Sequence, residues 1–361
     1  MAPIKSSLAR SVSKLLGVFK DTDLSLRGAT QSTRFFVPPI SASGGTKVIF
    51  GGVIYHTFTS SGAFTIDDDA GKSSIDIDIL VQGAGGGGGV IGGGGGAGGQ
   101  VQGSGVSFPL TAGPYPVTIG TGGNVAPGQA QSGTDGGDTT LNTPSSTLIT
   151  AKGGGGGGSH SSGGTSISGR PGGCGGGGGD NSGSYPYGTS TQGPQTSPLS
   201  PLTNFGSRGG TGSPVYTAGP RGGGGGGGTG GSGGDFPGRA GGTGKPYTIP
   251  TNGDPSTQTE YWFGGGGGGS PYQNNKLGPG GRGGGGGGWN DGPNALAPGG
   301  ADGYGGDVNG NPGPEHNRGG RAATNSGGGG GGADWDDSPG FGSNYRTGGP
   351  GILVISYPIT A

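Results

Sequence analysis

Cysteine and histidine are nearly absent from this sequence. Its one cysteine, Cys174, excludes an internal disulfide framework and stands between glycines, where we interpret it as a small residue tolerated at the end of a glycine run. The histidines, His56, His160 and His316, are far apart, and none has the spacing of a metal site or of a nucleophile and its base. We therefore expect no enzyme, no metal and no cofactor.

Charge and apolar residues are also sparse. Charged residues make up 11% of the chain and its formal net charge is −1, which argues against a nucleic acid or an anionic membrane as a partner bound by bulk electrostatics. Hydrophobic residues make up 25%, enough for only one small core. The apolar stretch from Leu15 to Phe19 is too short for a signal core or a membrane span, so we expect neither an export signal nor membrane insertion.

Glycine dominates instead, with 107 of 361 residues. Many of these glycines form eight uninterrupted runs of five to seven, at 85–89, 92–96, 153–158, 175–179, 222–228, 264–269, 283–288 and 327–332.

A glycine run cannot join a hydrophobic core and loses much backbone entropy on ordering, so the default expectation is disorder. Backbone hydrogen bonds between neighbouring runs would order it, because a polyproline-II-type helix has no internal hydrogen bonds and directs its N–H and C=O groups outward. The sequence has no sustained Gly-X-Y period, which excludes collagen. We expect the runs to pack as a bundle of polyglycine-II helices.

Strand patterns occur at the two ends of the glycine-rich body. Alternating or continuous apolar residues predict strands at 47–50, 53–58, 63–66, 75–81, 101–110, 115–119, 147–151 and 352–361. In residues 75–81 the isoleucines should share one face and the aspartates the other. Between 152 and 351 the sequence shows no convincing strand or helix.

These patterns predict a mainly β and irregular protein, with a small β-sandwich or sheet attached to the polyglycine-II bundle. We assign residues 1–44 to an N-terminal attachment arm and residues 45–152 to the β domain, which enters the glycine rods. Residues 153–349 form the bundle with its polar and aromatic loops, and residues 350–361 form a C-terminal strand that closes the β domain.

The N-terminal arm has apolar residues at helical spacing, which predicts a short basic helix at about residues 6–16 or an extended arm. We interpret the arm as a peptide that docks on another protein; the alternative is a leader folded back on its own body. The candidate attachment residues are Leu8, Val12, Leu15, Leu16, Phe19, Phe35 and Phe36.

The segments between the glycine runs contain most of the aromatic residues. Amphipathic aromatics on adaptable polar loops are typical of recognition surfaces, although they could instead cap the rod ends and cover glycine backbone. The candidate receptor-binding residues are Tyr185, Tyr187, Tyr216, Tyr247, Tyr261, Trp262, Trp289 and Trp335. Asp334, Asp336 and Asp337 beside Trp335 form an acidic cluster, which we interpret as a solvated loop in preference to a calcium or glycosidase site.

Four blocks of sequence carry a family resemblance: YHTFTSSGAFT at 55–65, IDILVQGAGGG at 77–87, LTAGPYPVTIG at 110–120 and GPGILVISYP at 349–358. In this order they resemble the glycine-rich domain found in bacteriophage tail fibres and other virion proteins. The leader, residues 4–34, is similar to leaders on structural proteins of marine cyanophages.

The resemblance implies a virion structural protein, a tail-fibre or fibre-tip adhesin that recognises a glycan or an outer-membrane protein of the host surface. The arm would bind other virion proteins, on a tail appendage or on the capsid surface. The alternative is a capsid decoration or head-fibre protein without specific receptor binding. A non-viral ice-binding protein would need regularly spaced threonines, which the sequence lacks. Fibres are often homotrimers, but one copy on a trimeric stalk is the other arrangement.

Overall fold

The structure is a computed structural model that describes residues 40–110, 113–128, 130–143, 145–160, 167–180, 186–195, 197–213, 221–237, 239–272, 278–288, 298–304, 319–333 and 346–360. The chain divides into two compact units, Met1–Pro38 and Pro39–Ala361, and every described residue belongs to the second. The expected helix at residues 6–16 lies outside the described residues.

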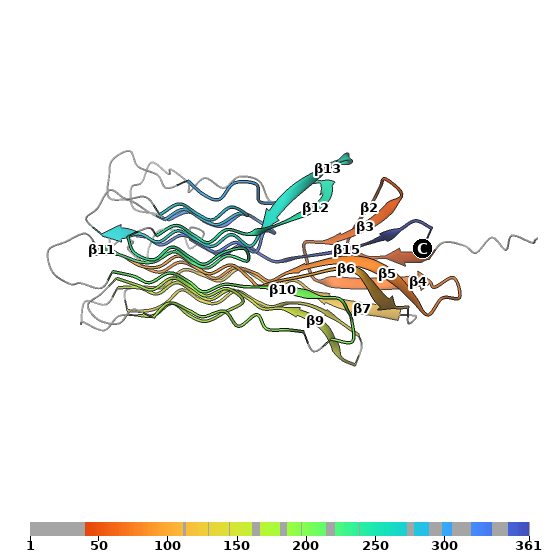
Figure 1. Ribbon diagram of the computed structural model, residues 1–361, viewed down its shortest axis with the longest axis horizontal. Coiled ribbons are helices and arrows are strands. Elements are labelled where there is room, and N and C mark those ends of the chain that lie inside the picture. Colours follow the sequence, from red (N-terminus) through yellow and green to blue (C-terminus); the bar gives the residue numbers. More distant parts are fainter. Residues whose placement is uncertain are drawn as a thin grey trace, which may run out of the picture. The chain divides into compact units, whose positions relative to one another are not determined.

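The described residues form an all-β structure of antiparallel sheets, without a helix among them (Figure 1). A five-stranded sheet has the order β1-β4-β7-β8-β9. Its strands are β1 (Ser41–Ser43), β4 (Gly62–Asp68), β7 (Gly113–Thr118), β8 (Thr139–Asn142) and β9 (Thr147–Ala151).

A six-stranded sheet has the order β10-β6-β5-β15-β3-β2. Its strands are β10 (Thr203–Phe205), β6 (Gln100–Pro109), β5 (Ser74–Gln82), β15 (Ile352–Pro358), β3 (Val53–Phe58) and β2 (Thr46–Phe50). Two further strand pairs are β12 (Lys245–Thr251) with β13 (Asp254–Phe263), and β11 (Arg221–Gly222) with β14 (Pro271–Tyr272).

The C-terminal strand β15 lies between β3 and β5, although it is far from both in sequence. Leu353 and Ile355 belong to the large hydrophobic cluster that also holds side chains of the five-stranded sheet. Ile352 and Val354 belong to a second cluster with Phe263 of β13. Both faces of β15 are therefore covered, which explains why its sequence is a continuous apolar run without alternation.

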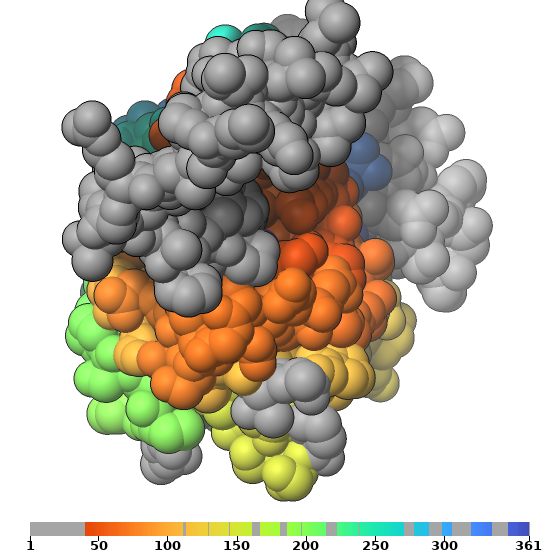
Figure 2. Space-filling model, turned by 90° about the vertical axis from the view of Figure 1, so that its right-hand side faces the viewer, coloured from red at the N-terminus to blue at the C-terminus, as the bar shows by residue number. Residues whose placement is uncertain are grey.

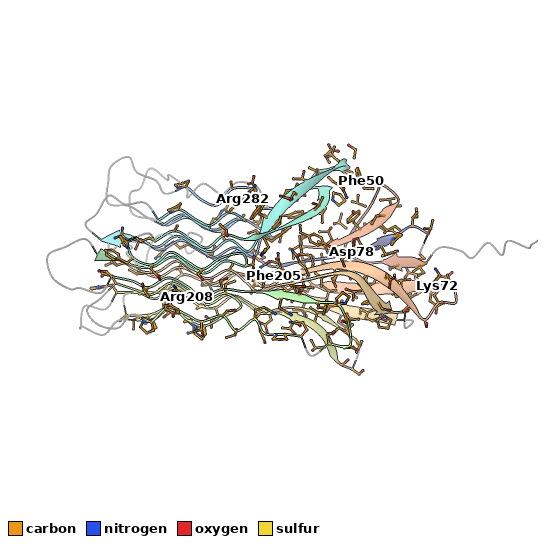
Figure 3. The ribbon with its side chains drawn as sticks, in the orientation of Figure 1. Phe50, Lys72, Asp78, Phe205, Arg208 and Arg282 are labelled. Carbon is orange, nitrogen blue, oxygen red and sulfur yellow. The ribbon has the colours of Figure 1, made fainter. Side chains whose placement is uncertain are left out.

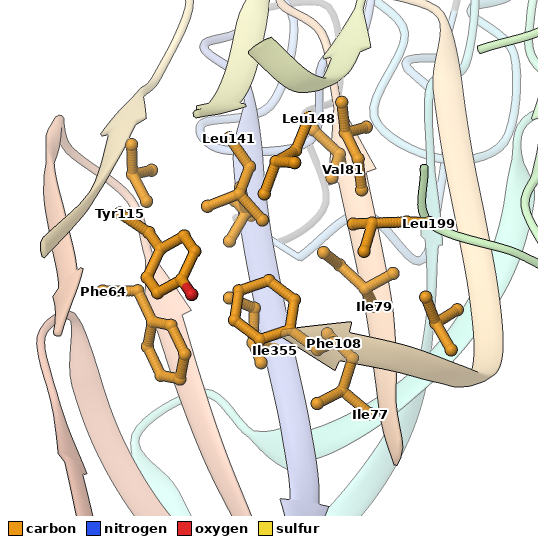
Figure 4. Close-up of a cluster of buried hydrophobic side chains, with 14 of the residues drawn as sticks. Phe64, Ile77, Ile79, Val81, Phe108, Tyr115, Leu141, Leu148, Leu199 and Ile355 are labelled. Carbon is orange, nitrogen blue, oxygen red and sulfur yellow. The ribbon is translucent and has the colours of Figure 1, made fainter. Parts of the chain in front are cut away.

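The large cluster takes side chains from both larger sheets (Figure 4). On β5, Ile75, Ile77 and Ile79 are buried in it, whereas Asp76 and Asp78 are exposed, as the alternation predicted. The aromatic rings of Phe64, Phe108 and Tyr115 pack together in the cluster, with Phe108 and Tyr115 centroids 4.8 Å apart. Figure 2 looks onto the sheets, and among its coloured residues the orange ones, from the first strands of the body, cover the widest area.

The glycine runs continue the strands and lie beside one another as wavy segments (Figure 1). In residues 84–89, N–H groups three residues apart donate to the same neighbour: Gly85 and Gly88 donate to residues 346–349. The other donors follow the same period, with Gly86 and Gly89 donating to residues 93–96, and Ala84 and Gly87 to residues 134–137.

The carbonyl groups of residues 84–89 repeat this pattern with three further neighbours. They accept N–H groups from residues 123–126, 154–157 and 330–333, again at a three-residue period. This central segment therefore has six hydrogen-bonded neighbours, and each N–H and C=O of residues 84–89 bonds to another segment. We call the set of glycine segments joined by such bonds the glycine lattice.

The close approach of these segments leaves no room for a side chain. A Cβ added to Gly94 would fall on the carbonyl oxygen of Gly267, and one added to Gly157 would fall on that of Gly93. By contrast, a Cβ on Gly193 would meet no heavy atom within 4 Å. Glycine is thus required in the lattice because neighbouring backbones occupy the space of the side chain.

The far end of the lattice, away from the sheets, is organised by the turn at Val90 and Ile91. The Val90 N–H donates to Ser159 Oγ at 2.8 Å, and the Ile91 N–H donates to the carbonyl of Ala333 at 2.6 Å. Ser270 Oγ accepts the N–H of Gly92 at 3.0 Å. Several glycine runs therefore end together around this turn.

We predict that Gly94→Ala lowers the free energy of unfolding by about 3 kcal/mol or more, because the methyl group forces two hydrogen-bonded backbones apart. Gly193→Ala is the matched control and should change it by less than about 0.5 kcal/mol, as surface substitutions usually do. Denaturant unfolding measures both. Equal stability of the two variants would contradict the close packing of the lattice.

Candidate recognition surface

Four of the eight predicted receptor-binding residues lie in the described part of the chain: Tyr187, Tyr247, Tyr261 and Trp262. The other four, Tyr185, Tyr216, Trp289 and Trp335, lie outside it. So do the predicted attachment residues Leu8, Val12, Leu15, Leu16, Phe19, Phe35 and Phe36, and the acidic cluster Asp334, Asp336 and Asp337.

Tyr247, Tyr261 and Trp262 lie on the β12–β13 hairpin and not in loops. The expectation of no strand between residues 152 and 351 was therefore wrong. The missed signal is the Asn252–Gly253 dipeptide, which forms the two-residue connection of the hairpin, with Gly253 at φ 82°.

Two prolines in β12 argued against a strand when only the sequence was considered. Pro246 and Pro250 of β12 stand opposite Trp262 and Gln258 of β13. The Trp262 N–H points away from β12 and donates to the carbonyl of Asp302 at 2.9 Å. At these positions the backbone groups face away from the partner strand, so the two prolines remove no hydrogen bond from the hairpin.

Tyr247 and Tyr261 stand opposite each other on the hairpin face that packs on the six-stranded sheet, against the cluster of Tyr55, Leu80 and Val354. Burial raises the pKa of Tyr247, and the nearby Asp78 carboxylate adds to this effect. The Tyr261 hydroxyl accepts the Asn252 N–H at 2.9 Å. Both tyrosines therefore help to hold the hairpin on the sheet.

Trp262 is covered by an arginine. The Arg282 guanidinium carbon lies 3.9 Å from the centre of the indole ring, and Arg282 Nε donates to Asp302 Oδ2 at 2.6 Å. Cation–π attraction and the ion pair hold the guanidinium in one orientation. One face of the Trp262 ring is thus already occupied within the chain.

Tyr187 has the same kind of arrangement on another flank of the glycine lattice. The Arg208 guanidinium carbon lies 4.4 Å from the ring centre, and its two Nη atoms donate to Asp235 at 3.0 and 3.1 Å. These bonds are the main cause of a lowered pKa of the Asp235 carboxyl group. Figure 3 shows Arg208 and Arg282 beside glycine segments on opposite sides of the view.

Asp235 also accepts a backbone N–H, that of Thr211, at 2.8 Å. Asp135 and Asp138 repeat this function, because they accept the N–H groups of Gly156 and Gly153 at 3.0 and 2.8 Å. Each also binds a cation, Arg170 for Asp135 and Lys152 for Asp138. We call these three aspartates the edge caps, since they supply acceptors for N–H groups at the margin of the lattice.

The described histidines and the cysteine have structural contacts. His56 is buried, with Nδ1 2.8 Å from the carbonyl of Gly44 and Nε2 3.3 Å from the Tyr357 hydroxyl, and burial lowers its pKa. His160 Nδ1 lies 3.1 Å from the carbonyl of Asp180. Burial raises the pKa of the Cys174 thiol to about 12, which disfavours the reactive thiolate.

The described ranges contain no cluster of three His, Cys, Asp or Glu residues able to hold a metal ion. A helix long and apolar enough to cross a membrane is likewise not found among them.

A family model described as a glycine-rich domain matches residues 59–358, well over half of the chain. The chain therefore belongs to this glycine-rich domain family. No curated protein matches it.

We predict that Asp235→Ala lowers the free energy of unfolding by about 1 kcal/mol more than Asp235→Asn, because Asn retains an acceptor for the Thr211 N–H. Losing the exposed ion pair with Arg208 should cost both variants less than about 1 kcal/mol. Denaturant unfolding at neutral pH measures the difference. Equal losses would show that Asp235 acts through its charge alone and does not cap the lattice edge.

Proposed function

We propose that the glycine segments are polyglycine-II helices in a hexagonal bundle, attached to a β-sandwich of the two larger sheets. The three-residue period of donors and acceptors in residues 84–89 supports the helix type, because such helices have three residues per turn and no internal hydrogen bonds. Their six neighbours support hexagonal packing. The hydrophobic cluster that takes side chains from both sheets supports the sandwich.

We further propose that the chain is a structural protein of a bacteriophage virion, a tail-fibre or fibre-tip adhesin that binds the host cell surface. Membership of the glycine-rich domain family and the four sequence blocks support this class. The observation that carries the adhesin proposal is the gathering of glycine-run ends around the Val90–Ile91 turn. The chain leaves the rigid lattice at this end, at points that we call exits. This arrangement suits a fibre that presents variable segments to a surface.

Four of the predicted aromatic residues follow, in the sequence, glycine segments that end near this turn. Tyr185 follows the exit at Asp180, and Tyr216 follows the exit at Ser213. Trp289 directly follows Gly288, and Trp335 follows the exit at Ala333. These four residues therefore become the preferred receptor-binding candidates, whereas Tyr247, Tyr261 and Trp262 serve the hairpin.

We assign attachment to the virion to residues 1–44. Of this segment the structure describes residues 40–44, which include β1, an edge strand of the five-stranded sheet. Its partners would be other virion proteins, on a tail appendage or on the capsid surface. The far end would bind a glycan or an outer-membrane protein, in a homotrimer or as a single copy on a trimeric stalk, without a catalytic step or a cofactor.

We predict that purified protein binds host cells and competes with phage adsorption. Trp289→Ala and Trp335→Ala should each weaken cell binding by about tenfold or more, because truncation of an aromatic hot spot costs about 2 kcal/mol. Trp262→Ala is the matched control at the sheets and should retain cell binding even where it lowers stability. Cell-binding isotherms and thermal unfolding separate these two effects.

Absence of both cell binding and competition would contradict the adhesin. Antibody labelling of intact virions then distinguishes the alternative. Label on the capsid would identify a decoration or head-fibre protein, and no label on any virion part would exclude the virion assignment altogether.

A further inference from the structure

Two buried glutamines mark the place where β5 and β6 pass into the glycine lattice. Gln82 and Gln100 are opposite each other in the β5–β6 pairing, so their side chains share one face of the six-stranded sheet. Both are 0% exposed. Glycine backbone encloses the Gln82 amide, since a Cβ added to Gly264 would lie 3.1 Å from its Nε2.

The amide orientation of Gln82 is fixed by two carbonyl groups. Its Nε2 donates to Gly98 O at 2.9 Å and to Gly83 O at 3.2 Å. A flipped amide would direct Oε1 at both carbonyl oxygens, which only accept hydrogen bonds. In the observed orientation Gln82 Oε1 is buried and has no hydrogen-bond partner.

The orientation of Gln100 is fixed through its neighbour Gln102. Gln102 Nε2 donates to the carbonyl of Pro246 at 3.2 Å and to Gln100 Oε1 at 3.2 Å. Because the Pro246 carbonyl accepts only, Gln102 must present its amino group here, and Gln100 must present its oxygen. Gln100 Nε2 is left buried without an acceptor.

The cross-strand pair therefore offers one free acceptor and one free donor in a site that bulk solvent does not reach. Buried polar groups left unsatisfied are costly, and folded proteins usually satisfy them with an ordered internal water. A water molecule has the required complement, because it donates to an oxygen and accepts from an amino group at once.

We propose that Gln82 and Gln100 form a binding site for one internal water, which donates to Gln82 Oε1 and accepts from Gln100 Nε2. Gln82 and Gln100 form the pair at the lattice end of the β5–β6 ladder. Beyond this pair, the two-residue alternation of the strands changes to the three-residue hydrogen-bond period of the lattice. The water thereby completes the hydrogen bonding of a junction that neither the strand ladder nor the lattice satisfies.

A high-resolution crystal structure of the full chain tests this directly. We expect solvent density within hydrogen-bond distance of both Gln82 Oε1 and Gln100 Nε2. A direct hydrogen bond between these two atoms would overturn the proposal, and so would a site without solvent density.

The wild-type protein in solution gives a second test, which needs no variant to fold. A long-lived internal water should give a nuclear Overhauser effect from water to the Gln100 side-chain amino group, with the sign of a bound molecule. Absence of this effect would overturn the proposal.

Water-proton relaxation dispersion then counts the long-lived waters. The double variant Gln82→Met/Gln100→Met should lose one of them relative to wild type. The control Gln195→Met, which removes a glutamine that pairs with the backbone of Thr150, should lose none. An unchanged count in a folded double variant would contradict the assignment.

Discussion

The structure depends on backbone hydrogen bonds between neighbouring glycine segments. In residues 84–89 every N–H and C=O bonds to another segment, and six segments surround the central one. This arrangement tolerates no Cβ, because the carbonyl of one segment occupies the space where the side chain of the next would begin. Glycine loses more conformational entropy on ordering than any other residue, so the lattice is stable only as a cooperative whole.

Such a lattice needs its glycine runs held in place and the N–H groups at its margin hydrogen-bonded. The sheets meet the first need and the edge caps meet the second. Strands such as β5, β9 and β13 lead directly into glycine runs, so the hydrophobic clusters hold one end of these runs in place. At the margin of the lattice, some outward N–H groups have no neighbouring segment, and the aspartates supply acceptors there. An edge of the lattice thus needs the same protection as an edge of a β-sheet.

The strands of the two larger sheets could mostly be predicted from sequence, because alternation on β5 and the continuous apolar run of β15 report the burial of their faces directly. The β12–β13 hairpin could not, because Pro246 and Pro250 suggest a loop unless the direction of their backbone groups is known. The neighbours of each glycine run were also unpredictable. Identical runs carry no side chains that select a partner, so strand topology and connection length must select it.

The sequence likewise did not show which contacts each candidate recognition residue makes. Sequence alone treated Tyr185, Tyr187, Tyr247 and Trp262 as equivalent aromatics between glycine runs. The contacts of the described residues separate them, because Tyr247 packs on a sheet while the rings of Tyr187 and Trp262 are covered by arginines. Which runs end together at Val90 and Ile91 depends on the direction of each segment, and that direction follows from the fold.

Amide hydrogen exchange of the intact protein tests the central claim, mutual hydrogen bonding of the glycine segments, most directly. We expect the N–H groups of residues 84–89 to exchange as slowly as those of residues 79–82 in β5 and 353–355 in β15, since all of these residues are buried and lie between hydrogen-bonded neighbours. Exchange of these glycines at the rate of an unstructured chain, beside protected strands, would contradict the account.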